Sequence, residues 1–215
     1  MSVAVKSELK AARKLLPLAY GDVGRKVLPI VVAQDAEGES NRGLGGWGLG
    51  IGFPDPAEIV DVAFSSLARG IPKEEVLALR NAGVEGVGPQ LSDHNIPNCW
   101  TDGSTRWYDL LARAHSYQEA IHLYEARTLI RSLEVTVKIP CTRRSHLVAL
   151  EDNSVVVGSF ARGRSPKWVL NNICRRKMAL ELAGDVMLAT AWLGTKRMPM
   201  DKLSRVRVVE RAKLQ

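Results

Sequence analysis

The most constraining stretch of the sequence is RGLGGWGLGIGF (42–53), in which glycine alternates with large apolar residues. Trp47, Leu49, Ile51 and Phe53 recur at every second position, which is the period of a β-strand. Such a strand has one face without side chains, where another backbone segment can approach closely. The same glycines formally match GxGxxG, but a dinucleotide site needs them between a strand and a helix. We therefore expect a glycine-faced strand and not a nucleotide site.

The rest of the first half predicts a mixture of helix and strand. The apolar run VLPIVVA (27–33) is typical of a buried strand, with Pro29 near its start or at a sheet edge. The pair Asp55-Pro56 is a good helix start, and that helix is expected to end near Leu67. Other expected features are helices at 3–16 and 72–82 and a turn-rich loop at 84–105.

The second half predicts the order α-β-β-β-α. A helix is expected from 106 to about 132, followed by strands at 133–139, 146–150 and 154–160. A last helix, with Ser165 as its N-cap, is expected to run to about Leu193. The predicted class is α+β: a three-stranded antiparallel sheet packed by helices, with a mixed, mostly helical N-terminal region. The predicted division is an N-terminal region (1–105), a basic αβββα domain (106–194) and a basic tail (195–215).

The charge is concentrated in the second half of the chain. The net charge is +7, but residues 1–107 hold 11 Lys and Arg against 13 Asp and Glu, a net of −2. Residues 108–215 hold 19 against 10, a net of +9, and residues 138–177 alone hold nine against two. Such an asymmetric basic surface indicates a polyanionic partner, most commonly nucleic acid.

The string VVVGSFARGRSPKWVLNNICRRKMALEL resembles a double-stranded-RNA-binding domain over residues 117–184. In that family a third strand leads through a glycine-rich basic loop into a basic helix start, which implies contacts with phosphates and 2′-hydroxyls of duplex RNA. The resemblance implies that RNA is held by the loop before the 146–150 strand, the loop after the third strand, and the last helix. The candidate residues are Arg143, Arg144, His146, Arg162, Arg164, Ser165, Lys167, Arg175 and Arg176.

A second resemblance lies within the last helix. LELAGDVML (180–188) looks like part of the ribonuclease III signature, whose Glu and Asp four residues apart hold Mg²⁺. Glu181 and Asp185 have that spacing and share a helix face. The family's additional Glu falls on Met178 here, so the ligand set is incomplete. A metal-dependent ribonuclease is therefore a second alternative, and no catalytic residue, metal or cofactor is predicted.

Several other classes are disfavoured by what the sequence lacks. His94 and Cys99 have no neighbouring ligands at zinc spacing, and no Cys–His nucleophile is evident. The three cysteines, Cys99, Cys141 and Cys174, are too few for a disulfide framework, so reduced thiols and a cytoplasmic location are expected. No apolar run is long enough to cross a membrane, and the N-terminus lacks a signal peptide's apolar core.

The expected function is therefore non-enzymatic binding of structured or double-stranded RNA through phosphate and shape contacts. The alternative is a viral coat or ribonucleoprotein assembly subunit, which would form a homo-oligomer and package nucleic acid. In either case the basic tail is expected to be an edge strand or an arm that contacts phosphates.

Overall fold

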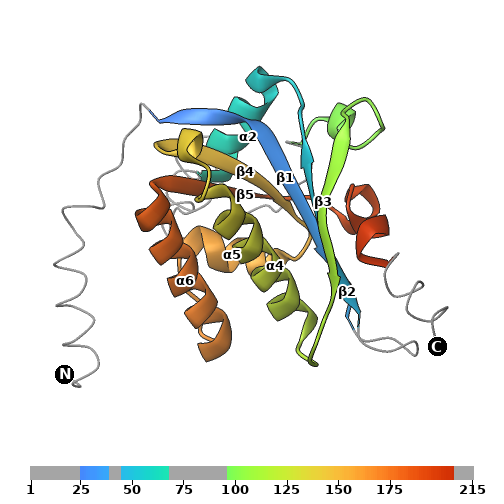
Figure 1. The fold of residues 1–215 in the computed structure, drawn as a ribbon, viewed down its shortest axis with the longest axis vertical. Coiled ribbons are helices and arrows are strands. Elements are labelled where there is room, and N and C mark those ends of the chain that lie inside the picture. The colour runs from blue at the N-terminus through green and yellow to red at the C-terminus, as the bar shows by residue number, and fades with distance from the viewer. Residues whose placement is uncertain (1–24, 39–44, 68–95, 206–215) are drawn as a thin grey trace, which may run out of the picture.

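Five strands form one mixed sheet in the order β3-β2-β1-β4-β5, as Figure 1 shows. This computed structural model describes residues 25–38, 45–67 and 96–205. Strand β1 pairs antiparallel with β2, and β2 pairs antiparallel with β3. On its other side β1 is parallel to β4, and β4 is parallel to β5. The strands are β1 (Lys26–Ala36), β2 (Gly46–Gly52), β3 (Trp107–Ala114), β4 (Ser145–Glu151) and β5 (Val186–Trp192).

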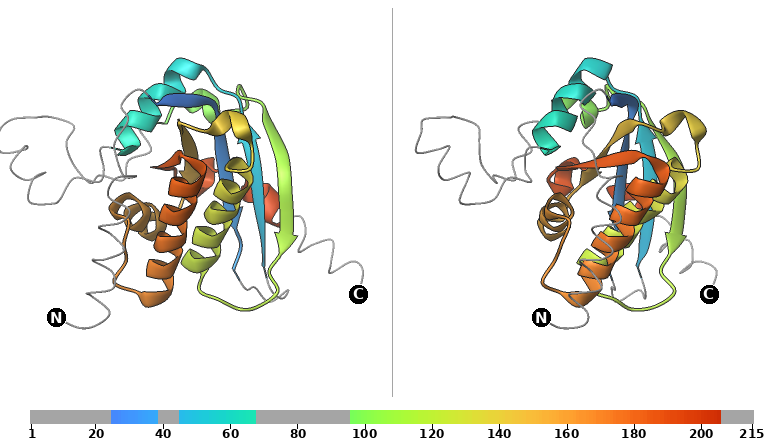
Figure 2. Two further views of the ribbon diagram at one scale, coloured as in Figure 1. Left: turned by 60° about the vertical axis from the view of Figure 1, so that its left-hand side comes forward. Right: turned by 90° about the vertical axis from the view of Figure 1, so that its left-hand side faces the viewer.

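Helices cover both faces of this sheet, so the two faces have separate hydrophobic cores (Figure 2). One core lies beneath α4, α5 and α6, and Leu129, Phe160 and Ile173 contribute to it. The other lies beneath α2, where Ile59 and Trp100 are fully buried. The helices are α2 (Pro56–Leu67), α4 (Ile121–Thr136), α5 (Ser154–Arg162) and α6 (Trp168–Gly184), with short 3₁₀ turns at Asn98–Trp100, Pro140–Thr142 and Thr195–Arg197.

The prediction of a glycine-faced strand is confirmed in β2. On its side-chain-free face lies the segment that follows β5, including a short helix at 201–205. A Cβ atom at Gly48 would lie 2.9 Å from Leu203 Cβ, and one at Gly50 would overlap the thioether of Met200. The absence of side chains on β2 therefore lets the 198–205 segment pack directly on the sheet.

Other parts of the first half also match the prediction. Strand β1 contains the predicted 27–33 strand, and α2 begins at Pro56 and ends at Leu67 as expected. Pro29 lies where the pairing of β1 with β4 is irregular, between Val27 and Val31, so its missing N–H interrupts no regular ladder. The predicted helices at 3–16 and 72–82, most of the 84–105 loop and the end of the tail lie outside the described residues.

The predicted strand at 154–160 is wrong, because these residues form α5. Asn153 caps this helix, and its side-chain oxygen accepts hydrogen bonds from the backbone N–H groups of Val155 and Val156. Val156, Val157 and Phe160 then share the buried face of the helix. A strong N-cap and one apolar helix face outweigh the β propensity of three consecutive valines.

The predicted boundaries around the long helix are also wrong. Residues 107–114 form edge strand β3, and α4 begins only at Ile121 and continues through the predicted 133–139 strand as far as Thr136. Leu133 extends the buried stripe of Leu129, and this packing favours helix over the local β pattern. Helix α6 ends at Gly184, and 186–192 form a strand where helix was expected.

The fold class is therefore confirmed only as a mixture of helix and sheet. The three-stranded antiparallel unit is wrong, because the sheet has five strands of mixed direction. The same sheet takes β1 and β2 from the predicted N-terminal region and β3, β4 and β5 from the predicted basic domain. Within the described residues, no helix has the length and apolar character needed to cross a membrane.

Adding one methyl group to the glycine face tests the packing of the 198–205 segment. We expect Gly50→Ala to destabilise the protein by roughly 1–3 kcal/mol, because Met200 is buried against this position. The matched control is Gly158→Ala in α5, where the nearest atoms are 3.5 Å away on the Arg162 guanidinium. That variant is expected to be neutral or slightly stabilised. Urea denaturation of both variants measures the difference; equal stabilities would contradict the packing.

Candidate metal centre

Two adjacent parallel strands bring two aspartates to the same edge of the sheet. Ala33 of β1 lies opposite Leu150 of β4, and continuing this register by two residues places Asp35 beside Asp152. Asp35 lies near the end of β1, and Asp152 directly follows β4. The carboxyl ends of parallel strands are where open α/β sheets bind ligands, because the chain turns away there and leaves side chains accessible.

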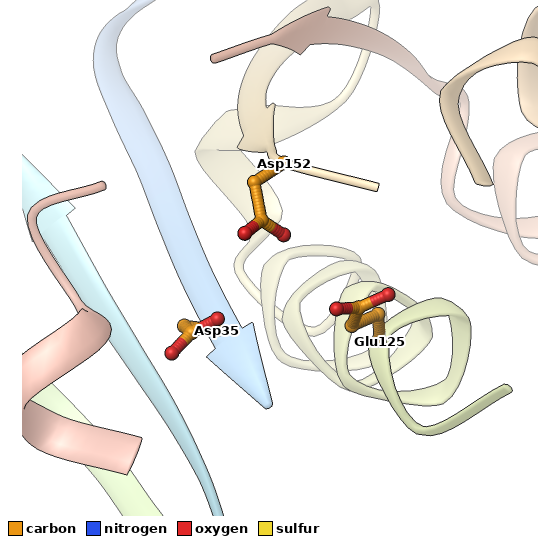
Figure 3. A group of neighbouring side chains, drawn as sticks. All are labelled: Asp35, Glu125 and Asp152. Carbon is orange, nitrogen blue, oxygen red and sulfur yellow. The ribbon is translucent and has the colours of Figure 1, made fainter. Parts of the chain in front are cut away.

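A third carboxylate comes from α4. The buried stripe of Ala126, Leu129 and Leu133 holds this helix on the sheet, and Glu125 lies next to it near the start of the helix. The oxygens of Asp35, Glu125 and Asp152 lie within 4.8 Å of one another, and the three residues come from three different elements (Figure 3). We call these three residues the carboxylate cluster.

The cluster is largely shielded from water. Asp35 is 6% exposed and Glu125 5%, whereas Asp152 is half-buried and forms the accessible side. Burial, followed by the charge of Asp152, raises the pKa of Glu125 to about 8, although a hydrogen bond with the Asn153 side chain opposes the increase. Burial also raises the pKa of Asp35, and Asp152 and Asp201 add to the increase although a hydrogen bond from Ser204 opposes it. Bringing these carboxylates together therefore has an electrostatic cost in the absence of a cation.

Polar neighbours orient two of the three acids. The Ser204 hydroxyl donates to Asp35 Oδ2 at 2.6 Å, and the Thr195 hydroxyl donates to Asp152 Oδ2 at 2.7 Å. Both donors belong to the segment after β5, part of which packs on the glycine face of β2. By contrast, Glu125 Oε2 is buried and has no hydrogen-bond partner among the described residues. A buried carboxylate oxygen without a donor is a group that a cation would satisfy.

A buried hydrogen bond lies behind the cluster. Gln34 and Glu151 directly precede Asp35 and Asp152, and the Gln34 amide donates to Glu151 Oε2. Glu151 is fully buried, and its Oε1 accepts the backbone N–H of Asn153 at 3.0 Å. Burial and then Glu125 raise the pKa of Glu151 well above its usual range, so the neutral acid is the favoured form. This pair ties the ends of β1 and β4 together.

The ligand atoms indicate which cation fits. All three are carboxylate oxygens, which are the ligands of hard cations such as Mg²⁺ and Mn²⁺. The half-buried Asp152 leaves one side open to a substrate oxygen. The arrangement is therefore suited to a divalent cation that binds an oxygen-rich substrate such as a phosphate ester.

The sequence-predicted residues at the start of β4 lie at the opposite edge of the sheet. Arg143 is exposed at the end of the 3₁₀ turn that precedes the strand, and Arg144 has a positive φ of 56°. His146 is 5% exposed, and burial lowers its pKa. It is the second residue of β4 and lies about 20 Å from Asp152 along the strand, and Arg143 and Arg144 lie farther away.

The predicted residues at the end of α5 and just after it form a second group. Arg162 and Arg164 are exposed, and the Ser165 hydroxyl accepts the backbone N–H of Lys167 at 3.2 Å. Lys167 is exposed at the start of α6. Helix α5 starts two residues after Asp152, so this group is separated from the cluster by the length of one short helix.

Helix α6 carries the remaining predicted residues. Arg175 and Arg176 are exposed, and Arg176 forms an ion pair with Glu134 of α4. Glu181 accepts hydrogen bonds from Lys177 and from the backbone of Leu188.

Asp185, the second acid of the ribonuclease III-like pair, forms a salt bridge with Arg25 at 2.6 Å. It lies just before β5, at the sheet edge opposite the cluster, and its backbone oxygen accepts the N–H of Arg144. Among the described residues, Asp35, Glu125 and Asp152 form the one acidic group close enough to hold a metal ion. The predicted pair is not part of it.

The thiol and imidazole groups do not form the sites considered from the sequence. His94 lies outside the described residues, and the Cys99 thiol donates to Glu58 at 3.3 Å. His115 is stacked on Tyr124 with ring centroids 3.6 Å apart. Neither arrangement resembles a zinc site or a Cys–His pair within the part of the chain that the structure describes.

The sequence alone did not bring the three acids together. The predicted strand at 27–33 ends before Asp35, Asp152 falls between the predicted strands at 146–150 and 154–160, and Glu125 falls inside the predicted long helix. The usable signal was that Asp35 and Asp152 each follow a buried apolar run by one polar residue. If the two strands are taken as parallel, both acids lie at one sheet edge.

Comparisons with known proteins give no further identification. The chain matches no protein-family model, no curated protein and no solved structure.

The raised pKa of Glu125 predicts how stability depends on pH. Above about pH 4.5 the unfolded chain loses this proton while the folded protein keeps it up to about pH 8, so the wild type loses stability over that interval. Glu125→Gln removes this loss. We expect the variant to gain on the order of a few kcal/mol over the wild type between pH 5 and about pH 9, in EDTA.

Urea denaturation at several pH values measures this difference. The control is Asp61→Asn, which changes an exposed acid on α2 and is expected to leave the pH profile unchanged. If the free energies of unfolding of Glu125→Gln and wild type depend on pH in the same way, burial of Glu125 in the cluster does not cost the stability described here.

Adding Mg²⁺ or Mn²⁺ is expected to raise the melting temperature of the wild type but not of Glu125→Gln.

Proposed function

We propose that the protein is a divalent-metal-dependent nuclease that hydrolyses phosphodiester bonds of nucleic acid at the carboxylate cluster. The observation that carries this proposal is the convergence of Asp35, Glu125 and Asp152, together with the buried, unpartnered oxygen of Glu125. Placing these acids together raises the pKa of Glu125 and of Asp35. This electrostatic cost is explained if a cation is the normal partner of the cluster.

The three acids have different parts in this proposal. Asp35 and Asp152 are held in place by the hydroxyls of Ser204 and Thr195, so their orientation does not depend on the cation. Glu125 offers a buried oxygen as the remaining ligand. When bound, a divalent cation polarises a phosphate oxygen and makes a coordinated water more acidic.

The charge of the chain supports a nucleic-acid substrate. The net of +9 in residues 108–215 would attract a polyanion towards an otherwise acidic centre. Arg162, Arg164 and Lys167 lie at the end of α5 or just after it, and α5 starts beside Asp152. We assign the three to the phosphates on that side of the cluster. RNA is the class that the sequence analysis predicted, and it remains the substrate proposed here.

This proposal differs from the expectation of binding without catalysis. It keeps RNA as the partner but adds hydrolysis, which the sequence analysis held only as a second alternative. It also moves the metal from Glu181 and Asp185 to the carboxylate cluster, because those two residues are in ion pairs elsewhere.

A cleavage assay tests the proposed activity. Fluorescently labelled single-stranded RNA, duplex RNA, an RNA–DNA hybrid and DNA are incubated with the protein in Mg²⁺, in Mn²⁺ and in EDTA. We expect cleavage only with a metal, and a loss of about 10²-fold or more in Asp35→Asn, Glu125→Gln and Asp152→Asn. Asp61→Asn, the exposed acid on α2, is expected to keep full activity.

Three outcomes of this assay would change the proposal. Cleavage that is equal in Glu125→Gln and wild type would come from a contaminant or another site, and would overturn the assignment. Binding of RNA without cleavage in either metal would return the protein to the class of non-enzymatic RNA-binding proteins. Cleavage of DNA alone would keep the metal centre and replace the substrate.

The basic group after α5 gives a separate prediction. Changing Arg162, Arg164 and Lys167 together to Ala is expected to raise KM while leaving kcat close to the wild-type value, because these residues contact the substrate and not the reacting phosphate. The dependence of binding on salt should also become shallower. An unchanged KM at low and high salt would remove these residues from the substrate path.

A further inference from the structure

A groove of about 560 Å³ runs between α4 and the edge strand β3. One end lies beside the carboxylate cluster. Tyr124 lines the groove and immediately precedes Glu125 on α4. The groove therefore begins one residue from a cluster acid, although none of the three acids lines it.

The walls of the groove are strongly basic. Five cationic side chains line it against a single carboxylate, that of Glu134. They come from three elements that lie side by side in Figures 1 and 2: β3, α4 with the residues just after it, and α6. The five are Arg113, Arg127, Arg131, Lys138 and Arg176.

Part of this charge is already used by ion pairs, and part is not. Glu134 accepts from both Arg131 and Arg176, so one negative charge lies between two positive ones. Arg127 donates two hydrogen bonds to Glu119 at 2.8 Å. A guanidinium has five N–H donors, so these arginines keep donors for a further anion.

Arg113 and Lys138 are the most available cations in the groove. Both are exposed, and neither has an ion-pair partner within the described part of the chain. Lys138 lies at the far end from the cluster. From Tyr124 to the end of α4 at Thr136 the helix rises about 18 Å, and Lys138 follows two residues later. The cations of the groove thus extend along its length and do not form a single anion site.

Aromatic rings lie at the end of the groove nearest the cluster. Tyr117 is 50% exposed, and behind it Tyr124 is buried and stacked on His115. The hydroxyl of Tyr124 donates to the backbone oxygen of Tyr117, which fixes the position of the loop that carries the exposed ring. Cationic grooves with exposed rings are how proteins hold single-stranded nucleic acid, because phosphates follow the cations and bases stack on the rings.

We propose that the groove between α4 and β3 binds a single nucleic-acid strand, the part of the substrate that continues from the phosphate at the carboxylate cluster. This inference rests on the proposed function for its orientation. The occupant is a single strand because the exposed ring of Tyr117 lies at one end of this row of cations, where it can stack on an unpaired base. In a duplex the bases are stacked on one another and are not available to that ring.

Binding measured in EDTA tests the groove independently of cleavage. The probe is a short fluorescein-labelled oligouridylate, and the readout is fluorescence anisotropy over a range of salt concentrations. We expect Arg113→Gln with Lys138→Gln to weaken binding about tenfold, and to make the slope of log K against log salt shallower by about 1.4 for the two lost contacts. Melting temperatures should be unchanged, because both residues are exposed.

A matched control places the same loss of charge at the opposite edge of the sheet. Lys26 at the start of β1 and Arg106 just before β3 are exposed there, and Lys26→Gln with Arg106→Gln should bind oligouridylate like the wild type. Equal weakening by both double variants would mean that net charge alone attracts the strand, and would overturn the groove as the binding site. Weakening by the control alone would move the site to that edge of the sheet, which also overturns it.

The aromatic contact is tested by Tyr117→Ala, with Tyr117→Phe as its control. The alanine variant is expected to lose about tenfold in affinity for oligouridylate, and the phenylalanine variant to bind normally, because the ring and not the hydroxyl stacks on a base. The hydrogen bond from the Tyr124 hydroxyl uses the backbone oxygen of residue 117 and remains in both variants. The ring contact with Tyr124, at 6.2 Å between centroids, remains in Tyr117→Phe.

A comparison with duplex RNA of the same length completes the test. We expect the groove variants to change duplex binding much less than oligouridylate binding; an equal loss for the duplex would overturn the single-strand assignment. If the wild type shows no metal-dependent cleavage but the groove variants lose oligouridylate binding, the proposed activity fails and the groove stands. If the wild type cleaves RNA in a metal-dependent way but the groove variants bind oligouridylate normally, the proposed activity stands and the groove is overturned.

Discussion

Parallel pairing of β1 with β4 is the constraint on which the rest of this structure depends. It places Asp35 beside Asp152, although the two residues are 117 positions apart in the sequence. It also requires a crossover between the strands, and α4, which lies in that crossover, delivers Glu125 to the same edge. If the two strands paired antiparallel, the two aspartates would lie at opposite edges of the sheet and no cluster would form.

The glycine face of β2 contributes to the same site from the other side of the sheet. Because it has no side chains, the 198–205 segment lies close enough for Ser204 to donate to Asp35. A conventional strand with alternating large residues on both faces would hold this segment away from the sheet. The most unusual composition in the chain thus acts on the cluster indirectly, through the segment that packs on it.

Local patterns predicted the elements whose own residues determine them. The runs VLPIVVA and HLVAL, the alternating glycines and the Asp55-Pro56 helix start were all interpreted correctly, since each carries its own period or cap. The segments SVVVGSF and LEVTVKI were misinterpreted, because their β-branched residues favour strand and only packing and the Asn153 cap make them helical. The cluster could not be predicted from local patterns. A strand predicted at 154–160 made residues 151–153 the turn of a β-hairpin, whereas in the structure Asp152 lies between β4 and the helix α5.

If the substrate is a polyanion, one requirement explains both the acidic cluster and the basic surface around it. A buried group of carboxylates repels phosphates, so a nucleic acid reaches it only if cations on the protein and at the cluster offset that repulsion. The described cations are distributed accordingly: some line the groove that starts beside Glu125, and others follow the helix that starts beside Asp152. The net charge of +7 is then better understood as two basic paths that lead to and from one acidic centre.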